Sequence, residues 1–406
     1  MKALRLSSYV LALGLVLSTA TQLRFLPSFG VGELLLLVWC IFISLKVLLK
    51  NRSINVSQSK YFIFYWYCSF LFLFIGWEIS LILGYRITEG ARDFIAYLFN
   101  SVLFFLFFVS SDLAQRFKFL SEGYYMISVV YLIVVFSILQ IDSTFAFKFL
   151  LFGGNRLSGF SDNPNQFALL LLPLPYLSIY YLKSASKYSL KAFHLLSLFL
   201  AVTAGFRTQS DALIVAWGAS VALLILGFYI YRFLKRRTMV QYAAILFLLL
   251  FMVLLLFINA DWIMEQKNEY MEEIIFSNSQ TGIRFNLWLN GLQAMSASPI
   301  FGLGPGAFSG VTGAFQQTEA HNTFIDWGTN TGMLGITLML FFLIAIGYKL
   351  IKKKKYLLIA MLCAILVFSM FHFTLRQPMF WFCIVMIILL MESNETWKYG
   401  NYSRKP

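Results

Sequence analysis

Long apolar stretches, separated by short polar segments, run through almost the whole chain of 406 residues. Stretches of roughly 17 to 25 apolar residues can cross the hydrocarbon core of a membrane as helices. Runs of alternating apolar and polar residues, which would predict strands, are absent. The pattern therefore predicts about twelve membrane-spanning helices. They lie at residues 7–25, 31–49, 61–83, 94–111, 122–140, 164–182, 191–206, 211–230, 239–259, 330–348, 356–373 and 378–392, and the pattern is weakest at 191–206 and 378–392.

The composition agrees with this pattern. Hydrophobic residues make up 60% of the chain and charged residues 12%, which is too little polar surface to cover a soluble globule of this size. No internal repeat or separate soluble domain is evident, so residues 1–406 are expected to form a single all-α, polytopic membrane domain. The four cysteines lie within predicted spans without paired spacing, and they indicate neither a disulfide framework nor a metal site.

The distribution of basic residues predicts the orientation. With the N-terminus inside, most of the 32 Lys and Arg residues fall in inner loops, as expected for cytoplasmic segments, so both termini are expected to be cytoplasmic. The net charge of +14 then reflects orientation, and nucleic-acid binding is not expected. The first span could imitate a signal peptide, but the many spans after it favour a retained anchor. The basic residues left on the outer side are Arg24, Arg86, Arg92, Lys148, Arg156, Arg207, Lys267, Arg284 and Arg376.

One long polar loop, residues 260–329, is predicted on the outer face between the ninth and tenth spans. Residues 261–277 alternate acidic and apolar positions, which predicts an amphipathic helix on the surface, and 281–296 predict a second helix. The glycines of 302–306 follow and predict a turn whose backbone amides can approach a ligand. They resemble a dinucleotide fingerprint only superficially, since no strand precedes them.

Four outer arginines are candidate anion ligands. Arg207 lies in a short polar break between two apolar spans, where a guanidinium is costly unless it faces a cavity or an anion. Its alternative is an ion pair with Asp211 across one helical turn. Arg284 is equally well explained as a surface residue, and Arg376 as an anchor at the membrane interface. Arg156 precedes an Asn163-Pro164-Asn165 segment that could simply start a helix.

Histidine is scarce, and only one of the three lies in the long loop. His321 is preceded by Glu319 and followed by Asn322. An imidazole titrates near neutral pH, which suits a general base or a donor to phosphate. A lone loop histidine is also commonly just solvated. His194 and His372 lie near the ends of predicted spans.

The order of these motifs resembles the O-antigen polymerase and O-antigen ligase superfamily of bacterial inner-membrane glycosyltransferases. The resemblance covers about residues 153–336. It rests on Arg156-Leu157-Ser158-Gly159, Asn163-Pro164-Asn165-Gln166-Phe167-Ala168, Phe206-Arg207, Arg284 with Trp288, Pro299 to Phe308, His321-Asn322-Thr323-Phe324-Ile325-Asp326, Gly328 and Gly332-Met333-Leu334-Gly335. Family members often have Ser where this chain has Phe206 and a small residue where it has Thr208, which weakens the placement of Arg207.

The resemblance implies a GT-C-like fold and a glycan transfer at the periplasmic face of the inner membrane, from undecaprenyl diphosphate to an acceptor hydroxyl. Arg207 and Arg284 would hold the diphosphate leaving group, and His321 would be the base, with Glu319 or Asp326 orienting it or replacing it. Trp288, Phe308 and Phe315 could stack on sugars. The expected substrate-binding residues are Arg156, Asn165, Gly304, Gly306, Asn322, Arg376, Trp288 and Glu319.

Several alternatives remain open at this point. The segment from Ala320 to Asp326 looks more like the polymerase versions of the motif, but an O-antigen ligase that uses lipid A-core as acceptor is the second candidate. A transporter of a lipid-linked solute, or a scaffold, is less favoured, because no repeat is visible and the polar residues gather at one face. No cofactor or metal is expected, since arginines can neutralise the charge. Expected partners are membrane lipids, the lipid-linked glycan and, as a candidate, a chain-length regulator.

Overall fold

A computed structural model describes residues 1–26, 29–49, 60–85, 87–110, 113–234, 280–307 and 318–392. Three expectations fall outside these residues: the span at 239–259, the surface helix at 261–277, and the stacking roles of Phe308 and Phe315. All statements below refer to the described part of the chain.

The described residues form an all-α polytopic membrane protein, as predicted. Eight helical segments among them are long and apolar enough to cross a membrane. They are α2 (Val31–Leu49), α3 (Lys60–Ile82), α4 (Gly90–Val109), α5 (Leu113–Ile141), α7 with α8 (Pro164–Ser184), α9 (Tyr188–Thr208), α10 (Asp211–Leu234, apolar over Asp211–Tyr229) and α14 (Thr323–Lys352).

Three further predicted spans are shorter helices, α1 (Lys2–Leu17), α15 (Tyr356–Ser369) and α16 (Pro378–Glu392). α16 is buried over most of its length, from Met379 to Ile387, and it contacts α1, α4, α5, α7, α14 and α15. A helix that is apolar on all sides is expected at the centre of a bundle, where no polar face is needed. The weak span signal at its position reflects its short length.

The predicted span at 164–182 is interrupted. It consists of α7 (Pro164–Leu171) and α8 (Leu174–Ser184), with a turn at Leu172 and Pro173 between them. Proline has no backbone N–H and clashes with the preceding helical turn, so Pro173 explains the break. The continuous apolar pattern did not reveal it.

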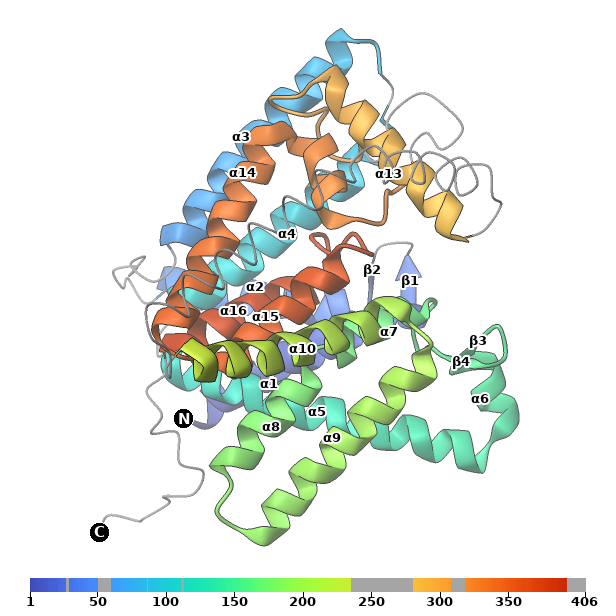
Figure 1. Cartoon of the computed structure of the whole chain (residues 1–406), viewed down its shortest axis with the longest axis vertical. Coiled ribbons are helices and arrows are strands. Elements are labelled where there is room, and N and C mark those ends of the chain that lie inside the picture. The colour runs from blue at the N-terminus through green and yellow to red at the C-terminus, as the bar shows by residue number, and fades with distance from the viewer. Residues whose placement is uncertain are drawn as a thin grey trace.

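Small elements gather at one end of the described helices, which the sequence predicts to face outward and which is called the outer end below. Two hairpins pair β1 (Arg24–Leu26) with β2 (Phe29–Gly30) and β3 (Leu151–Phe152) with β4 (Arg156–Leu157). The remaining described elements are η1 (Thr21–Leu23), α6 (Ser143–Phe149) and α13 (Gln280–Ala297). In Figure 1 the strands, α6 and α13 lie toward the right of the view and the N-terminus toward the left. Strands of two or three residues are too short to give an alternating pattern, so the sequence did not predict them.

Hydrogen bonds join outer segments that are distant along the chain. The backbone N–H of Gln22 donates to the carbonyl of Phe160 at 3.0 Å, and that of Asp162 donates to the Thr21 hydroxyl at 2.8 Å. The same hydroxyl donates to the side-chain oxygen of Gln166 at 2.8 Å. The loop after α1 is therefore fixed to the segment that begins α7.

α14 begins in the outer loop and then continues as a membrane span. It starts at Thr323, six residues before the predicted end of the loop, and is kinked at Gly332, which has a left-handed φ of 65°. A Cβ on Gly332 would lie 2.3 Å from the carbonyl carbon and oxygen of Ile300, so only glycine fits. The kink therefore divides α14 into a first part, residues 323–331, and the membrane span that follows it.

Candidate functional site

His321 stands at the outer start of α14, in a constrained backbone. Its φ is 52°, in the left-handed region that residues other than glycine rarely adopt. The fully buried carboxylate of Asp326 accepts hydrogen bonds from the N–H groups of Ala320 at 2.8 Å and Asn322 at 3.2 Å. Asn322 also caps α14, since its side-chain oxygen accepts from Phe324 at 3.0 Å. Uncommon conformations that are held in this way are a frequent feature of functional sites.

A chain of charged groups leads inward from His321. Nδ1 of His321 is 3.9 Å from one carboxylate oxygen of Glu319, and the other oxygen accepts from the guanidinium of Arg376. Arg376 also donates to the buried carboxylate of Asp93 on α4 at 2.9 Å. Burial would lower the pKa of Arg376, but the charges of Glu319 and Asp93 outweigh it and raise that pKa. Arg376 is therefore a fixed cation that holds the loop of His321 against α4.

Arg284 comes to the same region from α13. Arg284 and Trp288 are four residues apart, on one face of this helix. α13 packs on the start of α14, where a Cβ on Gly291 would meet the Ile325 side chain at 2.5 Å. The indole N–H of Trp288 is buried without a hydrogen-bond partner among the described residues. This donor is available to a ligand.

His372 shows that Arg284 and His321 are near one another. It lies in the turn after α15, and Thr323 donates to its backbone carbonyl at 2.6 Å. Burial lowers the pKa of His372 to about 3, with further contributions from the charges of His321 and Arg284. Charges affect a pKa in this way only at short range. The structure thus brings together three side chains that the sequence holds far apart.

The glycine turn packs against helices. Gly304 donates its N–H to the carbonyl of Asn330 at 3.0 Å, and a Cβ on it would lie 2.7 Å from the backbone of Trp77. A Cβ on Gly306 would lie 2.7 Å from the backbone nitrogen of Gly90. These glycines therefore permit a close approach to α3 and α4. Their contact with a substrate remains a prediction.

Arg156, Asn165 and Arg207 form a second group. Arg156 donates to the carbonyls of Thr208 and Gln209, both at 3.1 Å, at the C-terminal end of α9. The Ser210 hydroxyl donates to Asn165 at 2.7 Å. Arg207 is exposed beside these contacts. Asn163 caps α7 and Pro164 is in its first turn, so the helix-start interpretation of this motif is confirmed.

The expected alternative for Arg207, an ion pair with Asp211 across one helical turn, is wrong. Gln209 has a left-handed φ of 50° and ends α9, and Asp211 begins α10. No ion pair between the two is found among the described residues. Arg207 is accordingly not neutralised by Asp211.

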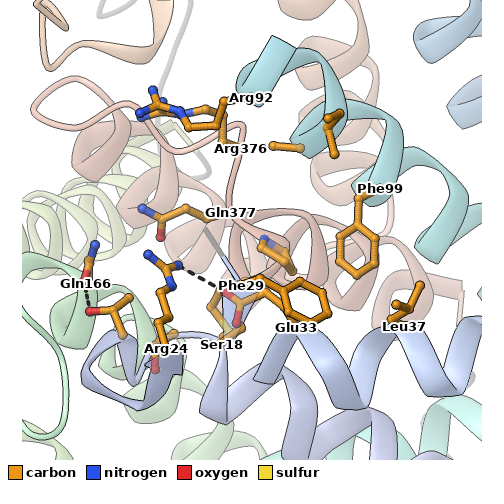
Figure 2. A pocket seen from close by; sticks show the side chains of 16 residues that line it. Ser18, Arg24, Phe29, Glu33, Leu37, Arg92, Phe99, Gln166, Arg376 and Gln377 are labelled. Carbon is orange, nitrogen blue, oxygen red and sulfur yellow. Dashed lines mark hydrogen bonds and ion pairs between the residues drawn. The ribbon is translucent and has the colours of Figure 1, made fainter. Parts of the chain in front are cut away.

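A cavity of about 450 Å³ lies at the outer end of the bundle (Figure 2). It is lined by residues of the loop after α1, of α2, α4 and α7, and of the start of α16. Gln166, adjacent to Asn165 of the second group, and Arg376, which contacts Glu319 of the first group, are both in its wall. The cavity therefore touches both groups, although no contact joins Arg207 directly to His321 or Arg284 in the described part of the chain.

Sequence reasoning missed several residues of this cavity. Arg24 and Arg92 line it, and Glu33 pairs with Arg24 at 3.1 Å. Both arginines were visible as outer basic residues at the ends of spans, which was the available signal. Asp93, the buried partner of Arg376, gave no signal, because a single acidic residue at a helix start is ordinary. Among the described residues no three His, Cys, Asp or Glu side chains are grouped as a metal site.

Comparison with known families finds a match over part of the chain. Residues 196–340 match the family model described as O-antigen ligase. This match supports membership of the O-antigen ligase and polymerase superfamily. The matched region contains Arg207, Arg284, Trp288, Glu319 and His321, whereas the cavity residues from α1 to α7 and Arg376 lie outside it. No curated protein matches the chain.

Proposed function

We propose that this O-antigen ligase superfamily protein polymerises oligosaccharide repeat units carried on undecaprenyl diphosphate, at the periplasmic face of the bacterial inner membrane. The observation that supports this most directly is the grouping of His321 and Arg284, both in the region matched by the O-antigen ligase family model, with His372 beside them. The reaction would join a glycosyl donor to an acceptor hydroxyl. A chain-length regulator is a candidate partner.

The departing diphosphate requires cations. As the bond between the sugar C1 and the phosphate oxygen breaks, its electrons stay on the diphosphate. Arg207 and Arg284 are proposed to hold this group, because a guanidinium is permanently charged and can donate two parallel hydrogen bonds to phosphate. Arginines placed this way stabilise the developing charge without a metal ion. Trp288, with its unpartnered indole N–H on the same face of α13 as Arg284, would contact the sugar.

His321 is proposed to take the proton of the attacking hydroxyl. Glu319 lies on the Nδ1 side of the ring, which favours the tautomer with its proton on Nδ1 and leaves Nε2 as the base. The carboxylate of Asp326 is buried and already accepts two backbone hydrogen bonds, so its proposed role is to position His321. Glu319 is similarly occupied by Arg376 and would orient the ring.

O-antigen ligation is the second candidate, because the matching family model is described as O-antigen ligase. The test supplies purified protein in nanodiscs with one lipid-linked repeat unit, alone or with lipid A-core, and with or without EDTA. A ladder of lipid-linked products from the repeat unit alone, resistant to EDTA, supports the polymerase. Product only with lipid A-core supports the ligase. No product under either condition contradicts both.

A further inference from the structure

The cavity has a polar part and an apolar part. The charged residues of its lining are Arg24, Arg92, Arg376 and Glu33. Figure 2 shows Arg92 and Arg376 toward the top, Gln377 below them, and Arg24 beside Glu33, to which a dashed line joins it. The apolar part includes Leu37 of α2, and Ile95 and Phe99 of α4. An amphipathic ligand with an anionic head would match both parts.

The apolar part reaches the surface that faces lipid. Ile95 is 64% exposed and Leu37 is 37% exposed, on two neighbouring membrane-spanning helices. Large apolar side chains exposed on such helices contact the hydrocarbon of the membrane. A lipid chain could therefore leave the cavity sideways between α2 and α4 while its head remains among the arginines.

The arginines are held in place by carboxylates, and one donor of Arg24 has no partner among the described residues. Glu89 and Asp93 pair with Arg92, and Glu319 and Asp93 pair with Arg376. None of these three carboxylates is among the lining residues of the cavity. Arg24 makes one ion pair, with Glu33, and its Nε is buried without a hydrogen-bond partner among the described residues. A buried donor without a partner is costly, and a phosphate oxygen would satisfy it.

We infer that this cavity binds the diphosphate and the first part of the polyprenyl chain of a second lipid-linked glycan, the acceptor. The inference rests on the proposed polymerase function, which needs two lipid-linked substrates at once. Arg24 and Arg92 are the proposed phosphate ligands, and Leu37, Ile95 and Phe99 contact the chain. The donor diphosphate is bound elsewhere, by Arg207 and Arg284.

The position of the cavity relative to His321 suits an acceptor. Arg376 lines the cavity, Glu319 binds Arg376, and Glu319 is 3.9 Å from His321. The attacking hydroxyl of an acceptor is at the other end of its oligosaccharide from the diphosphate. Its diphosphate can therefore be bound away from the base, as it would be in this cavity.

The test measures how many molecules of radiolabelled farnesyl diphosphate bind per protein in phosphatidylcholine nanodiscs, after subtraction of empty nanodiscs. The cavity variant is Arg24→Gln with Glu33→Gln and Arg92→Gln, so that no buried carboxylate is left without its partner. A second variant, Ala96→Phe, fills the cavity wall and changes no charge. Leu98→Phe is its control, on the same helix but exposed and outside the cavity. The donor-site variant is Arg207→Gln with Arg284→Gln.

Two bound molecules are expected in the wild type and in Leu98→Phe, and one in each of the other variants. In the arginine variants, affinity at the altered site should fall ~10- to 100-fold on loss of charged hydrogen bonds. In Ala96→Phe, the added ring should occupy space that the ligand needs. Unchanged binding in both cavity variants would overturn the inference. Displacement of farnesyl diphosphate from the cavity by phosphatidylglycerol, at the content found in ordinary membranes, would also overturn the inference. It would show that the cavity is a general site for anionic lipids. Failure of glycan transfer with intact two-site binding would instead count against the polymerase.

Discussion

Asp326 and His321 are linked through the backbone: the buried carboxylate of Asp326 accepts the N–H groups of both chain neighbours of His321, at 2.8 and 3.2 Å. This clamp holds His321 at a φ of 52°, which costs free energy in any residue except glycine. In this position Nδ1 of the imidazole lies 3.9 Å from a carboxylate oxygen of Glu319. Fixing a base in this way is what a positioned proton transfer requires.

Asp326→Asn should weaken both the loop and the reaction. An amide can accept with its oxygen, but its NH₂ group would face a second backbone N–H, so a loss of about 1–3 kcal/mol in the free energy of unfolding is expected. Misplacing His321 should lower the rate of glycan transfer roughly 100-fold. Asp142→Asn is the matched control, since Asp142 caps α6 and Asn caps a helix equally well. Equal transfer rates in the two variants would count against the clamp.

Arg376→Met should be strongly destabilising. It would leave the carboxylate of Asp93, which has 0% exposure, without its main partner, at a cost of about 3–5 kcal/mol. Adding Asp93→Asn should restore much of this loss. Arg92→Gln should cost less than ~1 kcal/mol, because Arg92 is 40% exposed and Arg376 still pairs with Asp93. Unfolding titrations of these variants, the single variant Asp93→Asn and the wild type test the order, and an additive double variant would refute the coupling.

His372 should make stability dependent on pH. Its pKa is about 3 in the folded protein and 6.5 when unperturbed, so below pH 6.5 the unfolded chain takes up a proton that the folded chain does not. The contribution of His372 to stability is therefore fully present above about pH 6.5 and is lost as the pH falls toward 3. Through this residue the free energy of unfolding should fall by roughly 2 kcal/mol between pH 7 and pH 5. His372→Phe keeps a ring beside Phe368 and should remove this part of the loss. Thermal unfolding at both pH values would show the same drop in variant and wild type if the assignment is wrong.

Gly304→Ala should prevent correct folding of the outer region. It would add the strain of a φ of 85° to a Cβ only 2.7 Å from the backbone of Trp77. Gly84→Ala is the control, with a similar φ of 71° and nothing within 4 Å, and it should cost only about 1 kcal/mol. Folded yield after gel filtration separates the two. Comparable yields would mean that α3 can move away from the glycine turn.

The apolar pattern predicted the membrane helices well, because the length of a span is set by the thickness of the bilayer. It failed where local geometry decides. Pro173 breaks a continuous apolar run, and the hairpins at Arg24 and Arg156 are too short to show a period. Gly332 kinks α14 because another segment, at Ile300, approaches it, and the sequence does not show which segment that is.

The site was predicted in part. His321, Arg284 and Glu319 were chosen for their chemistry and their order along the chain, and the structure places them in one region. Arg376 was predicted only as a possible ligand, and its ion pairs show that it also joins α4 to the His321 loop. Arg24 and Arg92 were not selected, because their importance depends on a cavity that forms between α2, α4, α7 and α16. The cavity can be recognised only from contacts between segments that are distant along the chain, and not from the residue type at any single position.

The most direct test of the proposed function is the His321→Gly variant, measured for polymerisation of one undecaprenyl diphosphate-linked repeat unit in nanodiscs and for thermal stability. Glycine adopts the left-handed φ of this position without strain, so the fold should be kept or slightly stabilised. Loss of the product ladder with an unchanged unfolding temperature, and its partial return with added imidazole, is the predicted result. A full ladder from His321→Gly without imidazole would contradict the account.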